Sequence, residues 1–269
     1  LGSPATPAQP VPLAARKVPP PQPTQLEWPA GRLEGEPAKR LLLDVMLAAK
    51  RRLEAVPGYT AIFRKQERLN GTLREEQTLR MKVRHEPFAV YLKFLAPKAG
   101  KEVLYAEGQH DNKLIAHNGD WTRRLIPRLK VSPTDPLALA DSRHPITEAG
   151  LLKLVNKLIH FRQIDLEDPE AVTILDRTTD EHGRAWLRST HYHPHYSPER
   201  PYQKTFILYD PETWLPLRIT NYEWAHPGED SDEEPVLVER YAYDDLRLDA
   251  PLTSLDFDLS NPEYEFSRY

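Results

Sequence analysis

The sequence feature that most constrains the fold is an Asn-Gly pair, Asn70-Gly71, which separates two runs of alternating polar and apolar residues. Asn-Gly is the preferred pair for a two-residue β-hairpin turn, because both turn residues adopt positive φ angles. Residues 59–69 and 72–84 are therefore predicted to form two antiparallel strands. With Leu69 opposite Thr72, four apolar side chains share one face: Ile62, Leu79, Met81 and Val83.

The same register brings opposite charges together across the hairpin. Glu67 is expected opposite Arg74, and Lys65 opposite Glu76. A slip by one residue would turn a charged set of side chains toward the core. The charges and the apolar residues thus favour the same register.

The rest of the chain predicts the fold class. Two segments have the apolar spacing of amphipathic helices: one follows Pro37 and ends at Pro57-Gly58, and the other runs from about Thr147, a candidate N-cap, to Gln163. Further strands are expected at residues 88–95, 102–106, 113–117, 172–179, 184–192, 202–209, 217–224 and 236–243. This pattern has no βαβ rhythm. It predicts an α+β fold in which a single curved antiparallel sheet, an unclosed half-barrel of about ten strands, wraps around two or more helices.

Proline sets the expected domain boundary. Many of the 27 prolines lie near the start of the chain, where they favour extended conformers. Residues 1–36 are predicted to be a proline-rich disordered tether, and residues 37–269 a half-barrel domain. The tether would either hold the domain away from a membrane or partner, or have no role.

Composition narrows the classes of function. A net charge of −4 argues against a general electrostatic interaction with nucleic acid. The chain has no apolar run of about 18 residues that would cross a bilayer. It also has no cysteine, which excludes thiolate catalysis and fits an oxidising compartment. We expect a periplasmic or otherwise extracytoplasmic protein, with a removed N-terminal segment as a candidate membrane tether.

Motifs of known chemistry are missing. The sequence contains no GxGxxG, GxxxxGK[ST], HExxH or GxSxG pattern, so no enzyme and no cofactor are predicted. His191 and His193 would share one face of a strand, where they could hold a metal or form a pH-sensitive patch. The alternative is a pair of partly exposed strand-end residues. Because no third ligand is identifiable, no metal site is predicted.

The segment from Ser132 to Pro145 is a candidate lid. Loops that carry apolar residues can close over ligand cavities, and the residues proposed for this role are Leu137, Leu139 and Arg143. The alternative is a connector whose leucines fill the core.

Several motifs between residues 59 and 147 resemble those of a known family. They are YTAIF at Tyr59–Phe63, VRHEPFAVYLKFL at Val83–Leu95, GKEVLYAEG at Gly100–Gly108 and SRHPIT at Ser142–Thr147. Together they resemble an uncharacterised family of exported bacterial proteins, a domain of unknown function found in planctomycete-type genomes. The likeness runs from about Ala38 to the C-terminus.

More distantly, the order of the elements is similar to the LolA/LolB lipoprotein-carrier superfamily. The later motifs that carry this likeness are YDPETWLPLRI at Tyr209–Ile219 and FDLSNPEYEF at Phe257–Phe266. The resemblance implies a LolA-like unclosed barrel over helices, with an apolar cavity for acyl chains. It also implies that Arg143 is the arginine that latches the lid. The sequence departs from the superfamily in lacking a clear lipid-binding signature.

Two functions remain open. The first is a carrier-type protein that binds a lipid or a lipoprotein acyl chain in the concave face, at Ile62, Leu79, Met81, Val83, Val90 and Leu92. The alternative is a non-catalytic module that binds an envelope protein or acts as a sensor, with its cavity filled by its own helices. Aromatic residues expected to be exposed support the alternative: Trp214, Tyr222, Trp224, Tyr241, Tyr243, Tyr264, Phe266 and Tyr269.

Overall fold

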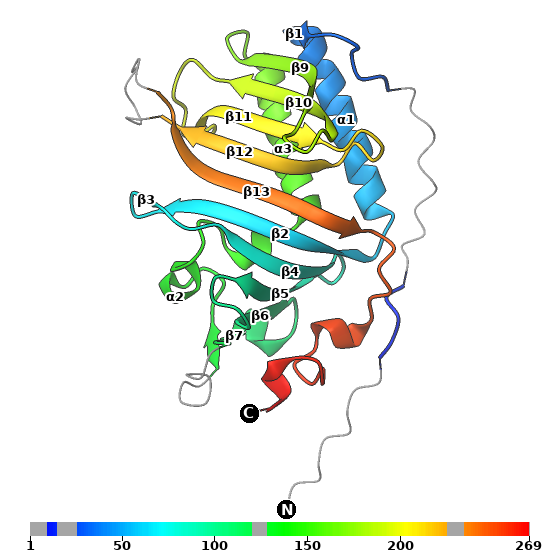
Figure 1. Ribbon diagram of the computed structural model, residues 1–269, viewed down its shortest axis with the longest axis vertical. Helices are drawn as coiled ribbons and strands as arrows, with labels where there is room; N and C mark the ends of the chain where they lie inside the picture. Colours follow the sequence, from blue (N-terminus) through cyan, green and yellow to red (C-terminus); the bar gives the residue numbers. More distant parts are fainter. Residues whose placement is uncertain (1–9, 15–25, 120–127, 225–233, 269) are drawn as a thin grey trace, which may run out of the picture.

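One antiparallel sheet dominates the computed structural model, which describes residues 10–14, 26–119, 128–224 and 234–268 (Figure 1). Its strands are β1 (Leu33–Glu34), β2 (Gly58–Leu69), β3 (Thr72–Leu73), β4 (Gln77–Arg84), β5 (Ala89–Ala96), β6 (Glu102–Ala106), β7 (Leu114–His117), β8 (Leu129–Val131), β9 (Val172–Thr179), β10 (Ala185–Tyr192), β11 (Tyr202–Tyr209), β12 (Pro216–Glu223) and β13 (Val236–Arg247). The order across the sheet is β1-β9-β10-β11-β12-β13-β2-β4-β5-β6-β7-β8, with β3 paired to β2.

Within the described residues, the two ends of this order, β1 and β8, do not pair, so the sheet stays open. Its two halves are meanders, β2 to β8 and β9 to β13, joined where β13 pairs with β2. The predicted α+β half-barrel is confirmed, with additional short strands.

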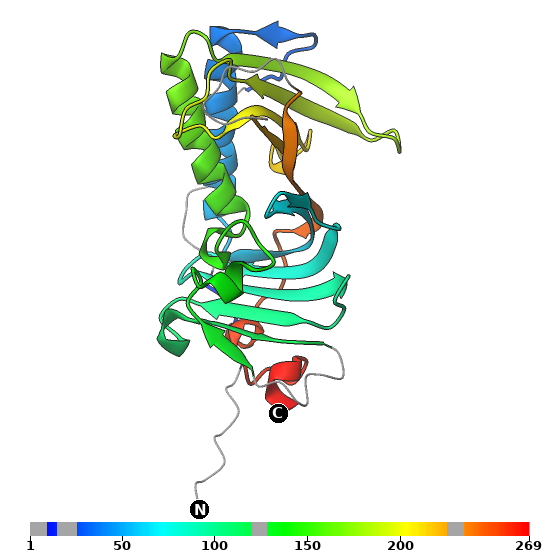
Figure 2. The ribbon, with the colours of Figure 1, turned by 90° about the vertical axis from the view of Figure 1, so that its left-hand side faces the viewer.

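Two long helices cover part of the concave face of the sheet. They are α1 (Glu36–Glu54) and α3 (Leu151–Glu167), which lie side by side in Figures 1 and 2. The predicted apolar stripe of α1 is buried, with every member at most 1% exposed: Leu42, Val45, Met46, Ala49 and Leu53. The helices and the inner face of the sheet form the main core.

The second helix begins later than its sequence indicates. Residues Ile146–Glu148 form a separate 3-10 turn, and α3 begins at Leu151 after Gly150. Gly150 has a φ of 98°, which favours glycine, and a side chain there would meet the hydroxyl of Tyr59. That hydroxyl instead accepts a hydrogen bond of 2.7 Å from the Leu151 amide, which fixes the start of the helix.

The predicted register of the first hairpin is wrong by one residue beyond the turn. The Asn-Gly turn forms as expected, with positive φ at both residues and Leu69 opposite Thr72. Residues 74–76 are not part of a strand, although the Arg74 amide still donates a backbone hydrogen bond to Glu67; from Gln77 on, Phe63 rather than Ile62 lies opposite Leu79. Ile62 lies opposite Arg80 on the outer face, while Leu79, Met81 and Val83 face inward as predicted.

The expected charge pairs change with the register. Lys65 lies 2.9 Å from Glu67 on the inner face, and both are buried. Glu76 pairs instead with Arg64 at 3.4 Å. The register was predicted on the assumption that charged side chains avoid the core. The assumption failed because Lys65 and Glu67 are paired with each other inside it.

Parts of the predicted tether contact the domain. Leu13 donates a backbone hydrogen bond to Leu252, and Trp28 is buried and donates to the carbonyl of Asp176. Leu33 pairs with Leu175 at the edge of the sheet. Residues 1–9 and 15–25 lie outside the described part of the chain, and for them the tether stays a prediction.

A second apolar cluster covers the outer face of β5 to β7, opposite the cavity described below. It contains Tyr91, stacked on Tyr264 with ring centroids 3.9 Å apart, together with Phe257 and Phe266. The aromatic residues expected to be exposed are therefore mostly internal: Trp224, Tyr243, Tyr264 and Phe266 are all at most 6% exposed. Tyr264 and Phe266 are internal because the C-terminal segment folds back on the sheet, whereas Tyr243 packs in the main core. Tyr269 lies outside the described residues.

Candidate ligand cavity

A cavity of about 440 Å³ lies between the sheet, α3 and the segment from Pro133 to Gly150. This volume falls within the range of small-molecule sites. Much of the lining is apolar and comes from both layers: Phe63, Leu79, Met81, Leu92, Phe94, Val103, Leu114, Ala116, Leu129, Leu154, Leu158, Phe161 and Ile219. The helices leave this part of the concave face uncovered.

The predicted cavity residues divide into three groups. Leu79, Met81 and Leu92 line the cavity. Val83 and Val90 are buried on the same inner face but pack into the core around it. Ile62 faces the other side because of the register change.

The candidate lid lies over this cavity. Its single helical turn is α2 (Pro136–Leu139), where Leu137 lines the cavity and is 64% exposed. Leu139 is half-buried and is not among the lining residues. Arg143 follows α2, and its side chain, 25% exposed, contacts acceptors on the sheet.

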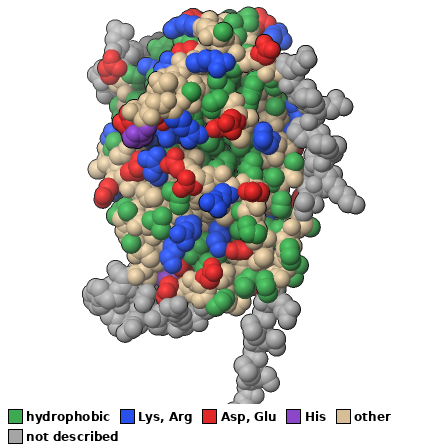
Figure 3. Space-filling view, turned by 45° about the vertical axis from the view of Figure 1, so that its right-hand side comes forward, with side chains coloured by type: hydrophobic (Ala, Val, Ile, Leu, Met, Phe, Trp, Pro, Cys, Tyr) green, Lys and Arg blue, Asp and Glu red, His purple; other side chains and the backbone are tan. Residues whose placement is uncertain are grey.

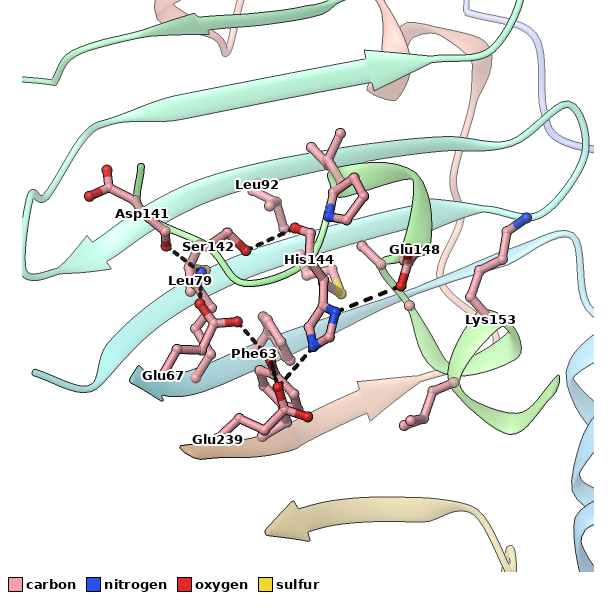
Figure 4. A pocket seen from close by; sticks show the side chains of 18 of the residues that line it. Phe63, Glu67, Leu79, Leu92, Asp141, Ser142, His144, Glu148, Lys153 and Glu239 are labelled. Atoms are coloured by element: carbon pink, nitrogen blue, oxygen red, sulfur yellow. Dashed lines mark hydrogen bonds and ion pairs between the residues drawn. The ribbon is translucent and has the colours of Figure 1, made fainter. Parts of the chain in front are cut away.

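Three residues attach this segment to the sheet, and two of them, Asp141 and His144, are labelled in Figure 4. The carbonyl of Asp141 accepts a hydrogen bond of 2.8 Å from Lys65. Arg143 forms an ion pair with Glu223 and donates to the carbonyl of Arg68 at 3.2 Å. His144 Nε2 lies 2.8 Å from a carboxylate oxygen of Glu239.

Salt bridges also hold the outer side of the segment. The Asp141 carboxylate accepts hydrogen bonds of 2.8 Å from Lys98 and 2.9 Å from Lys101. Burial opposes ionisation of Asp141, but these two ammonium groups outweigh it and lower its pKa to about 2. The segment is thus held by charged contacts from two sides.

Glu239 is the centre of the buried polar groups at the cavity. It is 2% exposed and accepts hydrogen bonds from Tyr202 at 2.6 Å and Asn221 at 2.7 Å, besides the contact with His144. Burial alone would raise the pKa of Glu239, but these hydrogen bonds hold it at about 2. A carboxylate with this many donors stays ionised although it is buried.

The pairing of the strands explains how these polar groups meet. Glu67, Glu239, Asn221, Thr205, His191 and Thr173 lie opposite one another in turn, on β2, β13, β12, β11, β10 and β9. We call these six residues the polar row; each is at most 7% exposed. Sequence reasoning missed the row, because a transverse row becomes visible only when the register of all six strands is known.

Hydrogen bonds connect neighbours along the polar row. Thr205 donates to Asn221 at 2.8 Å, and the Tyr241 hydroxyl lies 2.6 Å from Glu67 and 3.1 Å from Glu239. Burial and the two carboxylates raise the pKa of Tyr241, so its proton stays in place. The cavity therefore has an apolar part, toward β4 to β8, and a polar wall along β11, β12, β13 and β2.

His191 and His193 are buried and are not strand-end surface residues. His193 lies 2.9 Å from Asp165, and His191 lies 2.9 Å from Ser189 and 3.2 Å from Thr173. Burial and the nearby Arg162 lower the pKa of His191, which keeps it neutral. Among the described residues, no group of three or more His, Asp or Glu side chains could hold a metal ion.

Charge on the outer surface is mixed. On the face drawn in Figure 3, basic and acidic side chains are interspersed rather than separated by sign.

Within the described part of the chain, no helix is both long enough and apolar enough to cross a bilayer.

The fold and the cavity define the class: an open antiparallel half-barrel whose concave face holds two helices and an uncovered apolar cavity. The chain belongs to the family described as "Protein of unknown function (DUF1571)", whose model matches residues 56–266. This match confirms the expected membership of a family of unknown function. No curated protein matches the sequence.

Solved structures similar to this chain include two proteins with lipoprotein-related descriptions. One is a putative outer membrane lipoprotein-sorting protein domain from Vibrio parahaemolyticus, with 13% identity, a TM-score of 0.37 and coverage of 80% of this chain and 95% of that chain. Another is the lipoprotein LppX of Mycobacterium tuberculosis, with 10% identity, a TM-score of 0.41 and coverage of 77% and 95%.

A third is a LolA superfamily protein from Nitrosomonas europaea, with 8% identity, a TM-score of 0.30 and coverage of 76% and 91%.

Proposed function

We propose that this protein is a non-catalytic, extracytoplasmic carrier that binds an apolar ligand, a lipid or the acyl chain of a lipoprotein, in the cavity between α3 and the sheet. The observation that carries the proposal is the cavity itself, about 440 Å³ in volume and lined by apolar side chains from both layers. An apolar cavity in contact with solvent is unfavourable when empty, and a chain of methylene groups would remove that surface from water.

The segment from Asp141 to His144 acts in this proposal as the lid latch. Its contacts with Lys65, Glu223 and Glu239 are polar, so they can break in water and reform, unlike a packed apolar contact. Exposed Leu137 of α2 would contact either the bound chain or the surface that delivers it. The latch gives Arg143 the role that the family resemblance implies for it.

Two observations favour this function over the interaction module. That alternative needs helices that fill the concave face, whereas α1 and α3 leave the cavity open. It also relied on exposed aromatic residues, and Trp224, Tyr264 and Phe266 are buried. The extracytoplasmic setting rests on the cysteine-free composition and the family resemblance.

Native mass spectrometry of the protein after incubation with a bacterial lipid extract tests the proposal. We expect a retained adduct with the mass of a lipid. A Leu154→Trp variant, which fills the cavity from α3, should retain less of it, and a Leu208→Trp variant outside the lining should behave as the wild type. Wild-type protein that retains no lipid from the extract would contradict the carrier function.

A further inference from the structure

The polar wall of the cavity contains one cation whose donors are not used. Arg162 lines the cavity from the last turns of α3 and is only 3% exposed. Its Nη2 lies 3.0 Å from Asp165, but Nε and Nη1 have no hydrogen-bond partner among the described residues. A buried charged donor without an acceptor is unfavourable, because it has lost its water without replacement.

The acceptors nearest to Arg162 are engaged with other donors or with its Nη2 alone. Asp165, the ion-pair partner of Arg162, also lies 2.9 Å from His193 and 3.4 Å from Arg200. Within the polar row, Asn221 and Thr205 are bound to each other, and Glu239 accepts from several donors. Neither Asp165 nor these residues of the polar row accept a hydrogen bond from Nε or Nη1 of Arg162.

The lysines that line the cavity differ from Arg162 because each is either paired with a carboxylate or exposed to water. Lys65 is paired with Glu67, and Lys101 with Asp141. Lys153 and Lys157 are exposed on α3, where water solvates them. Among the described Lys and Arg side chains that line the cavity, Arg162 is thus the one that is buried and has N–H groups without an acceptor.

We propose that Arg162 binds the anionic head group of the ligand, a carboxylate or a phosphate on a single apolar chain, at the polar wall of the cavity. This inference rests on the proposed carrier function and adds the chemical class and the orientation of the ligand. The apolar chain extends along Leu154 and Leu158 toward β4 to β8, and the head group lies beside the polar row.

An anion fits this site better than a neutral or cationic group. Hydrogen bonds between a guanidinium and an oxyanion are shorter and stronger than those to a neutral oxygen. An ammonium head group would add a second positive charge beside Arg162 and would leave both N–H groups unpaired. The carboxylates of Glu239 and Glu67 repel the anion only weakly, because each already has a partner. Glu239 lies 2.8 Å from His144, and Glu67 lies 2.9 Å from Lys65.

Displacement of Nile red, a neutral apolar dye, from the full chain tests the proposal. Competitors with the same apolar chain would be palmitate, monocetyl phosphate, cetyl alcohol and methyl palmitate. We expect at least one of the two anions to displace the dye at a concentration about tenfold or more below that of the alcohol and the ester. The stronger anion identifies the head group as a carboxylate or a phosphate.

Two variants test whether the preference for an anion depends on Arg162. Arg162→Met should bind the alcohol as the wild type does and lose the preference for the anion, and Lys153→Met, at the mouth, should keep it. If Arg162→Met does not fold, the Nε–H resonance of Arg162 in wild-type protein should shift with palmitate or monocetyl phosphate and not with cetyl alcohol.

Two results would overturn the inference while the carrier function stands: equal displacement by all four compounds, or loss of the preference in Lys153→Met as well. If no compound displaces the dye and no lipid is retained, the carrier function fails and the inference with it.

Discussion

A larger side chain at position 116 distinguishes an open cavity from a packed core. Ala116 lies on β7, is 7% exposed and lines the cavity, so the added carbons of Ala116→Leu enter unfilled space. Leucine adds three carbons, each worth about 0.8 kcal/mol when buried, so the free energy of unfolding should rise by about 1–2 kcal/mol after the loss of side-chain entropy. The same change in a filled core would lower it by about 1–3 kcal/mol.

Ala106→Leu is the matched control. Ala106 lies on β6, is fully buried in the outer apolar cluster and does not line the cavity. Urea unfolding of both variants, followed by fluorescence, should show Ala116→Leu more stable than wild type and Ala106→Leu less stable. Equal destabilisation of the two variants would refute the reasoning, because it would mean that no free volume exists beside Ala116.

Three further predictions concern the polar wall, the lid and the outer face. Glu239→Gln should lower the free energy of unfolding at pH 7 by about 3 kcal/mol, since a pKa lowered from 4.5 to about 2 stabilises the fold by that order. This stability is complete above pH 4.5 and is lost as the pH falls toward 2, so urea unfolding should show the variant and wild type converging there; a constant difference would contradict the assignment. Arg143→Met should speed hydrogen exchange in residues 132–148 by about tenfold, while Lys98→Met should speed it less, because Lys101 still pairs with Asp141; equal rates in the two variants would argue against the latch. Phe257→Ala, fully buried on the outer face, should lower stability by about 3–5 kcal/mol without weakening dye binding by the folded protein, and a weaker affinity would show that the two faces are coupled.

The fold could be predicted from the sequence because periodicity and turn residues are local signals. The Asn70-Gly71 turn and the apolar stripe of α1 both depend on residues close in sequence, and both formed as expected. The predicted register failed at residues 74–76, because nothing in the alternation marks where the pairing shifts by one position. This shift placed Phe63 instead of Ile62 on the cavity side.

The candidate site was only partly predictable. Leu79, Met81 and Leu92 line the cavity because strand alternation identifies an inner face whatever the exact partner. Glu239 and Arg162 were missed, since a charge in a strand or helix is ordinarily read as exposed. Their burial depends on partners far away in sequence, such as His144 and Asp165, which only the folded chain brings near.

The most direct measurement of the central claim is photo-cross-linking with a fatty acid that carries a diazirine near the end of its chain, followed by peptide mapping. The account predicts labels on cavity residues of α3 and of the inner face of β4 and β5, such as Leu154, Met81 and Leu92, and their suppression by unlabelled palmitate. Labels confined to the outer cluster around Tyr264, or labels that palmitate does not suppress, would contradict it.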